Sequence, residues 1–517
     1  MNYSTHTIIA LSMLTILFGC NRTDKDISAS IHMDNTPILS LTEGTAIGTV
    51  TIHGNDCVVE GFKAKFSETK GLKDIVCTKL IASEDDSSCF NLLVKIKDTP
   101  DLSNRIKLEK LTILTNQGKI KLDCSSSPLY RTGIALRQRY QDGVNNCRIP
   151  GLVTTTKGTL LAMYDARRDA DRDLQGDIDI CYNRSTDGGR SWSEMKVALD
   201  MGAYGGLPQK YNGVSDGSML VDTETGDIFV TGLWMYGVHD PETGEFVEGL
   251  TEESTEWNHQ WRSYGSQAGY DIKQSCQYLI AKSTDDGISF GNPINITRQV
   301  KPEAFWLIAP APGAGIVLED GTLVLPSEGR TETGLQFSTI IYSKDHGETW
   351  TSGSPAYTNT NECMAVQLSD GSIMLNARER SNRNKIEGNG RKIATTNDLG
   401  QTWTLHPTNQ SALIEPACQG SLLKHCYRDK SGSERNLLLF FNPSSISKRE
   451  NFTLKMSLDD GMTWPEEYWI QFDALPGEGY SCMTSIDNDT IGILYEGSGA
   501  NLVFQQIKVE ELLQKIQ

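Results

Sequence analysis

Short runs in which apolar and polar residues alternate dominate the chain and predict β-strands rather than helices. Near the N-terminus these runs cover residues 46–53, 90–97, 105–114 and 119–122. The last two runs flank Asn116-Gln117-Gly118, a turn sequence that predicts a β-hairpin. Residues 509–516 differ, because their apolar positions recur at helical spacing and predict a short amphipathic helix. The pattern as a whole predicts an all-β fold.

A turn motif occurs five times, on the plan Ser/Thr-x-Asp-x-Gly-x-Ser/Thr-Trp/Phe. The copies are residues 185–192, 283–290, 343–350, 396–403 and 457–464. In such a turn the Asp carboxylate accepts backbone N–H bonds, the Gly supplies a positive φ, and the aromatic ring covers the turn. Each copy follows a β-type run, so we assign it a structural role. Hairpins repeated in this way predict a six-bladed β-propeller in which one blade lacks the motif.

A change in composition near Cys124-Ser125-Ser126-Ser127-Pro128 marks a boundary between two units. We expect residues 30–127 to form a small β-sandwich of the carbohydrate-binding type. We expect residues 128–517 to form the propeller. An aromatic platform for sugar is not readable in the first unit, whose aromatic residues are Phe62, Phe66 and Phe90.

The N-terminus has the features of a targeting segment. The apolar stretch Ile8–Phe18 is too short to span a bilayer and leads into Leu17-Phe18-Gly19-Cys20, which resembles a lipoprotein signal. Residues 1–20 are therefore expected to be a lipoprotein-type signal peptide and residues 21–29 a tether. A plain secretory signal is the alternative, since residues 1–18 contain no Lys or Arg. Either kind of signal peptide predicts an exported protein. We expect it in the periplasm or attached to the outer membrane, with the cell surface as a further alternative.

The net charge and the cysteine content limit which substrates, partners and cofactors are expected. The net charge of −18 argues against nucleic acid as a partner and requires any anionic substrate to bind at a local basic site. The twelve cysteines lack metal-type spacing and are expected to be buried small hydrophobes. Export leaves open disulfides among Cys57, Cys77, Cys89 and Cys124. The chain has no phosphate loop and no zinc motif, so neither a cofactor nor a catalytic metal is expected.

Short sequences with titratable residues lie between the turn motifs. In chain order they are Cys147-Arg148-Ile149-Pro150, the run 161–167 ending in Arg167, Asp173-Leu174-Gln175, Ser215-Asp216-Gly217, Gly232-Leu233-Trp234, Thr360-Asn361-Glu362-Cys363, Leu375-Asn376-Ala377-Arg378, the stretch around Arg449, Gly479-Tyr480-Ser481 and Leu494-Tyr495-Glu496. With these motifs in this order, the segment from Tyr130 onward resembles the bacterial exo-sialidases of glycoside hydrolase family 33. One departure is Cys147, where the family has Phe at a packing position.

The resemblance implies an arginine clamp for the carboxylate of a terminal sialic acid, made of Arg148, Arg378 and Arg449. Guanidinium groups hold a carboxylate through charge-assisted, partly bidentate bonds. Three cations in one pocket repel each other, so the acidic Glu496 is expected to steady Arg148. Contacts with the rest of the sugar are implied for Arg167, Asp216 and Trp234. Neighbours that could take the place of a matched cation are Arg168, Arg380 and Lys448.

The resemblance also implies the reacting groups. Tyr480 is the expected nucleophile, since a neutral hydroxyl approaches the substrate carboxylate without like-charge repulsion. Most glycosidases use two carboxylates, and sialidases are an exception with a tyrosine nucleophile. Because tyrosine has a pKa near 10, a base must assist it, and Glu362 fits. Nearby arginines are expected to lower that pKa further. Asp173 is the expected acid/base, with Asp169 and Asp171 as open alternatives.

The function implied is an exo-α-sialidase that acts on sialylated glycans with a retaining mechanism. The alternatives are a trans-sialidase, a sialidase that releases anhydro-sialic acid, and a glycan-binding propeller without catalysis. A glycan-binding propeller without catalysis would lack the acid/base, the assisting base and the nucleophile. This chain has candidates for all three, Asp173, Glu362 and Tyr480. We expect a monomer that meets a membrane only through its lipid anchor.

Overall fold

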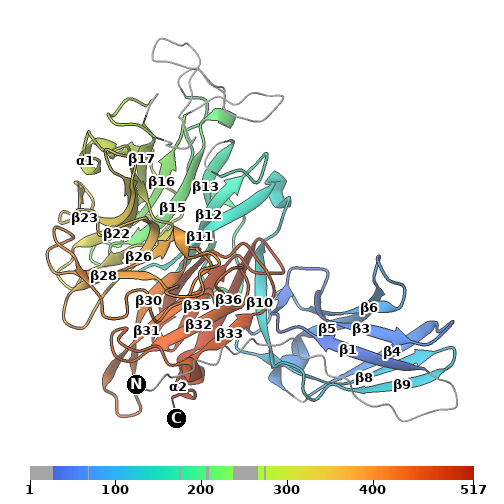
Figure 1. The fold of residues 1–517 in the computed structure, drawn as a ribbon. Helices are drawn as coiled ribbons and strands as arrows, with labels where there is room; N and C mark the ends of the chain where they lie inside the picture. Colours follow the sequence, from blue (N-terminus) through green and yellow to red (C-terminus); the bar gives the residue numbers. More distant parts are fainter. Residues whose placement is uncertain are drawn as a thin grey trace. The chain divides into compact units, whose positions relative to one another are not determined.

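The computed structural model describes residues 27–67, 69–173, 176–204, 209–236, 266–272 and 275–516. The chain divides into two compact units, residues 1–132 and 133–517, and strands dominate both (Figure 1). The expected signal peptide and residues 21–26 of the expected tether lie outside the described residues. Among the described helices, none combines the length and the apolar character that a bilayer crossing needs.

The first unit is built from two antiparallel sheets. One has the order β1(Ser28–Met33), β3(Thr45–His53), β6(Cys89–Ile96), β5(Ile75–Ala82), and the other β4(Val59–Phe66), β8(Leu108–Thr115), β9(Gly118–Asp123). Shorter elements are β2(Ile38–Ser40), the 3-10 helix Lys70–Asp74 and β7(Arg105–Ile106). Thr115 pairs with Gly118 across the predicted hairpin, which is confirmed. Alternate residues of the strands, such as Val50, Val94 and Ile113, are buried in one core.

The described strands of the second unit form six sheets, most of them in simple chain order. The first three contain β11(Asn146–Thr154), β12(Leu160–Arg167), β13(Ile178–Ser185) and β14(Lys196–Leu199); β15(Val214–Val221), β16(Ile228–Trp234), β17(Gln277–Ser283), β18(Ile294–Asn295) and β20(Gly313–Ala314); and β19(Leu307–Pro310), β21(Ile316–Val317), β22(Leu323–Arg330), β23(Gln336–Ser343), β24(Thr351–Ser352) and β25(Tyr357–Thr358).

The remaining sheets contain β26(Thr360–Gln367), β27(Ile373–Glu379), β28(Lys392–Thr396) and β29(Thr404–Leu405); β30(Ser421–Arg428), β31(Glu434–Pro443), β32(Phe452–Ser457) and β33(Ile470–Asp473); and β34(Ser481–Asp487), β35(Thr490–Tyr495), β36(Leu502–Lys508) and β10(Tyr130–Arg137). Short helices of this unit are α1(Thr297–Val300), α2(Val509–Leu513) and the 3-10 turns 141–143, 209–211, 380–382 and 466–468. The predicted C-terminal helix is confirmed by α2, although it is shorter than expected.

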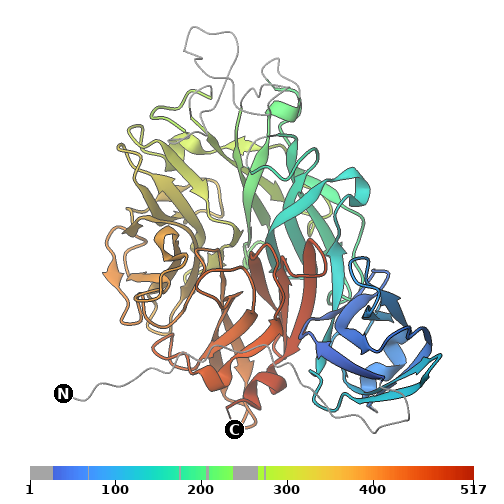
Figure 2. The same ribbon diagram turned by 45° about the vertical axis from the view of Figure 1, so that its right-hand side comes forward.

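The six sheets contact one another in a closed sequence. β11 contacts β15, β15 contacts β22, β22 contacts β26, β26 contacts β30, β30 contacts β34, and β34 contacts β11. Figures 1 and 2 show the sheets following one another in chain order. The last sheet joins the two ends of the unit by backbone hydrogen bonds, because Ile134 on β10 pairs with Phe504 on β36. Because the first and last strands of the unit pair with each other, the ring of sheets has no gap between them.

The turn motifs have the contacts that their chemistry predicts, which confirms their structural role. In the last copy Asp459 accepts bonds from the Thr463 N–H at 2.8 Å and from the Ser457 hydroxyl at 2.7 Å. Gly461 has a φ of +83°, and the Trp464 indole N–H donates to its carbonyl at 3.0 Å. The five copies begin at the last residues of β13, β17, β23, β28 and β32.

The residue after the Asp of the motif joins its sheet to the preceding one. Asp286 accepts bonds from the Thr155 hydroxyl at 2.6 Å and the Thr159 hydroxyl at 2.7 Å, both in the β11–β12 turn. His346 lies 2.8 Å from Asp222, which follows β15. These polar contacts couple neighbouring sheets at one end of the unit, a role that the motif itself does not reveal.

The cysteines behave as small apolar residues. All eleven in the described part of the chain are free thiols, seven of them buried. The disulfides left open among Cys57, Cys77, Cys89 and Cys124 are therefore not formed.

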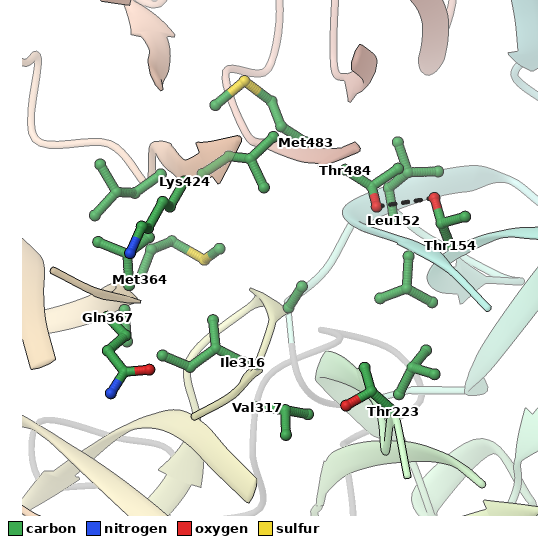
Figure 3. A pocket seen from close by; sticks show the side chains of 18 of the residues that line it. Leu152, Thr154, Thr223, Ile316, Val317, Met364, Gln367, Lys424, Met483 and Thr484 are labelled. Atoms are coloured by element: carbon green, nitrogen blue, oxygen red, sulfur yellow. Dashed lines mark hydrogen bonds between the residues drawn. The ribbon is translucent and has the colours of Figure 1, made fainter. Parts of the chain in front are cut away.

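A cavity of about 420 Å³ is lined by the ends of the inner strands (Figure 3). Apolar side chains such as Leu152, Ile316 and Met364 form its walls, and the hydroxyls of Thr154 and Thr484 lie 3.1 Å apart beside it. Its lining contains a single acidic residue, so it offers no pair of carboxyl groups for acid–base chemistry.

Candidate active site

A second cavity, of about 460 Å³, is lined by polar and charged side chains. Its residues come from the beginnings of β11, β15, β19, β23 and β26, from the ends of β22 and β27, and from nearby loops of the second unit. Of the residues predicted from the sequence, it is lined by Arg148, Asp173, Asp216, Glu362, Arg378, Arg449 and Tyr480. Arg167, Trp234 and Glu496 are not among its lining residues. The fold thus brings together groups that are hundreds of residues apart in the chain.

β-Bulges place several of these side chains. The β11–β12 register shifts between Arg148 and Gly151, and the β26–β27 register shifts between Thr360 and Cys363, next to Glu362. A third shift lies at Asp216, which has a φ of +55°. A bulge bends its strand and redirects a side chain, which explains why these residues leave the regular alternation and point into the cavity.

Arg148 is fixed by the buried carboxylate of Glu496. Its Nε and Nη2 lie 2.7 and 3.2 Å from the two carboxylate oxygens, which also accept the N–H groups of Ile149 at 2.8 Å and Tyr480 at 2.9 Å. Burial alone would lower the pKa of Arg148, but the charge of Glu496 raises it well above its usual value. Burial likewise opposes ionisation of Glu496, yet Arg148 holds the pKa of that carboxyl below its usual value. Both groups are therefore charged.

Tyr480, Glu362 and Arg378 form one hydrogen-bonded group. The Tyr480 hydroxyl donates to Oε1 of Glu362, and Nη1 of Arg378 lies 2.6 Å from Oε2 of Glu362 and 3.0 Å from the hydroxyl. Burial, followed by the charge of Glu362, raises the pKa of Tyr480 well above its usual value, although Arg378 and Arg449 act in the opposite direction. The two arginines therefore act in the expected direction, but burial and the carboxylate outweigh them.

Gly479 lets the segment around Tyr480 approach its neighbours closely. It has a φ of +102°, and a Cβ there would lie 2.7 Å from Sγ of Cys418 and 2.8 Å from Cδ of Arg449. The guanidinium groups of Arg148 and Arg449 lie 5.7 and 5.4 Å from the centre of the Tyr480 ring. Such contacts favour the cations over the ring face.

Asp173 is held by Arg167 at 2.5 Å while its side chain remains 71% exposed. The alternative Asp171 pairs with Arg139 at 2.6 Å, and neither it nor Asp169 lines the cavity. Arg167 is itself buried and also lies 3.4 Å from Asp165. Arg167 therefore orients Asp173 rather than lining the cavity.

The buried Asp165 and the half-buried Asp216 form an acidic pair. The Asp216 N–H donates to Asp165 Oδ1 at 3.1 Å. Burial raises the pKa of Asp165 to about 7, although the charge of Arg167 opposes this. Burial, with the charge of Asp165 next, raises the pKa of Asp216 well above its usual value. Asp165 is therefore poised to bind a proton near neutral pH, so it is suited to donating hydrogen bonds as well as accepting them.

Trp234 lies apart from the cavity lining. Its indole ring is 2% exposed and packs edge-on against Tyr204 and Tyr236, at centroid distances of 4.9 and 6.0 Å. Its contact with a substrate stays a prediction.

Sequence reasoning missed several residues that line the cavity. They are Ile149, Leu307, Glu328, Gly329, Arg330, Gln336 and Asn361, and Arg380 had been weighed only as a substitute for Arg378. Burial, with the charge of Glu362 next, raises the pKa of Glu328 to about 8. The signal for Arg380 was its position two residues after Arg378, on the same face of a strand. No local signal marks Glu328. Among the described residues, no cluster of His, Cys, Asp and Glu has the geometry of a metal site.

Comparison with known proteins defines the class. The family model described as a BNR repeat-like domain matches residues 149–464. The chain is 38% identical to a sialidase of Bacteroides fragilis (strain YCH46) over 426 residues, 82% of this chain and 74% of that protein. It is 33% identical to a sialidase of Micromonospora viridifaciens, covering 72% of this chain and 53% of that protein.

Solved structures of sialidases are also similar to this chain. The Hadza microbial sialidase Hz136 superposes with a TM-score of 0.81 at 31% identity, covering 93% of this chain and 99% of that one. The Trypanosoma rangeli sialidase, at 18% identity and a TM-score of 0.57, shares the fold and covers 74% of this chain and 60% of that one. The chain belongs to the bacterial sialidase family, and its activity is that of a glycoside hydrolase.

Proposed function

We propose that the six sheets of the second unit are the blades of a six-bladed β-propeller and that the first unit is a β-sandwich. The closed sequence of sheet contacts and the β10–β36 pairing support the propeller. The turn motif follows one strand in each of five sheets and is missing from the sheet that contains both ends of the unit. The beginnings of the inner strands would then surround one axis, which explains how seven distant residues line one cavity.

The proposed reaction is hydrolysis of terminal α-ketosidic sialic acid from glycoproteins, glycolipids and oligosaccharides, with retention of configuration. The observation that carries this proposal is the hydroxyl of Tyr480 donating to Glu362 while Arg378 contacts both. A tyrosine paired with a base and flanked by cations has the arrangement of an activated nucleophile. A carboxylate nucleophile would instead repel the carboxylate of the substrate.

In the proposed binding mode the arginine clamp holds the sialic acid carboxylate. Arg148 is presented by Glu496, which occupies its Nε and Nη2 edge and leaves Nη1 for the ligand. Arg378 contacts the Tyr480 hydroxyl, the guanidinium group of Arg449 lies 5.4 Å from the centre of the Tyr480 ring, and both arginines line the cavity. Charge-assisted bonds from these groups fix the anomeric carbon near the nucleophile.

In the first chemical step, Tyr480 Oη attacks the anomeric carbon while Glu362 takes its proton. Asp173, oriented by Arg167, gives a proton to the glycosidic oxygen as the bond to the leaving group breaks. The product is a sialyl-tyrosine, and the cations stabilise the oxocarbenium-like transition state. In the second step water, deprotonated by Asp173, attacks the anomeric carbon, and the tyrosine leaves with the proton from Glu362. The two inversions give net retention.

The test measures release of sialic acid from α2,3- and α2,6-linked substrates by the wild type, Tyr480→Phe and Tyr427→Phe. Tyr427 is a matched control because it lies on β30 and does not line the cavity. Tyr480→Phe is expected to lose most turnover while still binding sialic acid, and Tyr427→Phe is expected to match the wild type. Unchanged hydrolysis by Tyr480→Phe would refute the assignment. Mass spectrometry of the product separates hydrolysis from transfer and from anhydro-sialic acid formation.

A further inference from the structure

The carboxylate of Glu478 faces two arginines of the clamp. Its Oε2 lies 3.5 Å from Nη1 of Arg148 and 4.0 Å from Nη1 of Arg449. Its charge is one of the causes that raise the pKa of Arg148. Glu478 therefore neutralises the Nη1 edge of Arg148, which the proposed binding mode assigns to the substrate, and also lies near Arg449.

The two glutamates near Arg148 occupy different environments. Glu496 is 0% exposed and receives four hydrogen bonds, so it stays in place. The side chain of Glu478 is 57% exposed and, within the described part of the chain, makes only the two longer ion-pair contacts. An exposed ion pair at such distances contributes little free energy and is readily exchanged for water or another anion.

The backbone of Glu478 is held independently of its side chain. Its carbonyl accepts a bond from Nη1 of Arg449 at 2.6 Å, and Gly477 donates to the Arg449 carbonyl at 2.9 Å. The carboxylate can therefore swing toward solvent without releasing Arg449. A fixed backbone with a free carboxylate is the arrangement that a displaceable counter-ion requires.

We propose that Glu478 is a displaceable counter-ion of the clamp, which occupies the carboxylate position in the empty enzyme and thereby sets the affinity for anionic sugars. The proposal rests on the proposed function, because it assigns the substrate carboxylate to the same arginine edges. Binding then exchanges one carboxylate for another at Arg148 and Arg449. The exchange weakens binding by the free energy of the lost ion pair and leaves the chemical step unaffected.

The test compares Glu478→Gln and Glu478→Asp with the wild type and with Glu450→Gln. Steady-state kinetics give KM and kcat, and calorimetry gives the Kd of free sialic acid. Glu478→Gln is expected to lower KM and Kd by about two- to fivefold, the range expected for an exposed ion pair, with kcat unchanged. Glu478→Asp keeps the charge but shortens the side chain, so it is expected to lower both constants as well.

Glu450 is the matched control, because it is adjacent to Arg449 in sequence and does not line the cavity. Its replacement by Gln removes the same charge and is expected to leave KM unchanged. An unchanged or higher KM for Glu478→Gln overturns the proposal. So does a wild-type KM for Glu478→Asp, which would show that only the long-range field of the charge matters. An inactive wild type would refute the proposed function, whereas an active enzyme with an unchanged Glu478→Gln variant refutes this inference alone.

Discussion

Replacement of Glu496 by Gln tests whether one buried carboxylate organises both the clamp and the nucleophile. Glu496 accepts two bonds from Arg148 and one each from the N–H groups of Ile149 and Tyr480. A Gln keeps one acceptor oxygen but turns an amide N–H₂ toward these donors. The substitution therefore removes the counter-charge of a buried cation and leaves donors facing donors.

The expected losses of stability and activity follow from these contacts. Removing one partner of a buried ion pair destabilises a protein by about 3–5 kcal/mol, because the other charge stays buried without compensation. We expect the free energy of unfolding of the second unit to fall by about this amount. We also expect kcat/KM to fall by about 100-fold, since a displacement of about 1 Å in a positioning group has that effect.

Tryptophan fluorescence during urea unfolding is a suitable assay. All nine tryptophans follow residue 132, so the signal reports on the second unit alone. Glu434→Gln is the matched control, because it breaks an exposed pair with Arg428 at 3.3 Å and is expected to cost less than about 1 kcal/mol. If Glu496→Gln unfolds at the wild-type urea concentration with an unchanged kcat/KM, the reasoning fails.

The pH dependence of the same variant gives an independent check. The pKa of Glu496 is lowered in the folded protein, chiefly by Arg148 against the opposing effect of burial. Its stabilising contribution is therefore fully present above the pKa of an unfolded Glu, about 4.3, and is lost as the pH falls through the lower folded value. The difference in unfolding free energy between wild type and Glu496→Gln is expected to shrink in acid. A constant difference would contradict the charge-based explanation.

Two further predictions concern the turns and the sheet contacts. Asp459→Ala removes the bonds from Ser457 and Thr463, and is expected to lower the free energy of unfolding by about 1–3 kcal/mol while kcat at 25 °C stays unchanged. A lost kcat would contradict the structural role. Asp222 raises the pKa of His346, so the stability from this pair is present below about pH 6.5 and lost as the pH rises through the folded value. The Tm difference between wild type and His346→Gln should be larger at pH 5 than at pH 9; equal differences would refute it.

The fold was predictable wherever local rules decide the structure. The β8–β9 hairpin depends on its turn residues, and the five motif turns depend on an Asp, a Gly and an aromatic residue in fixed positions. The pairing of β10 with β36 was not predictable, because it joins Ile134 to Phe504 and no local pattern connects them. The contacts of Asp286 and His346 with the preceding sheet were missed for the same reason.

The site was predictable where a residue belongs to a motif of the resembled family. Arg148, Glu362 and Tyr480 occur in such motifs, and the structure places them around one cavity. Glu328 occupies an ordinary strand position, and only the packing of β22 against β26 brings it near Glu362. Sequence shows which charges a chain has, but burial and distance depend on the tertiary structure.

The pKa of Tyr480 shows what this difference means for the mechanism. Two arginines near a tyrosine suggest a phenolate, yet burial and the charge of Glu362 keep the hydroxyl protonated in the resting site. Its proton must then move to Glu362 during the attack, along the hydrogen bond that already joins them. Arg378 contacts the oxygen at 3.0 Å and is placed to stabilise the charge that develops there. A neutral nucleophile therefore meets the anionic substrate, and the arginines act on the carboxylate and the transition state rather than on a preformed phenolate.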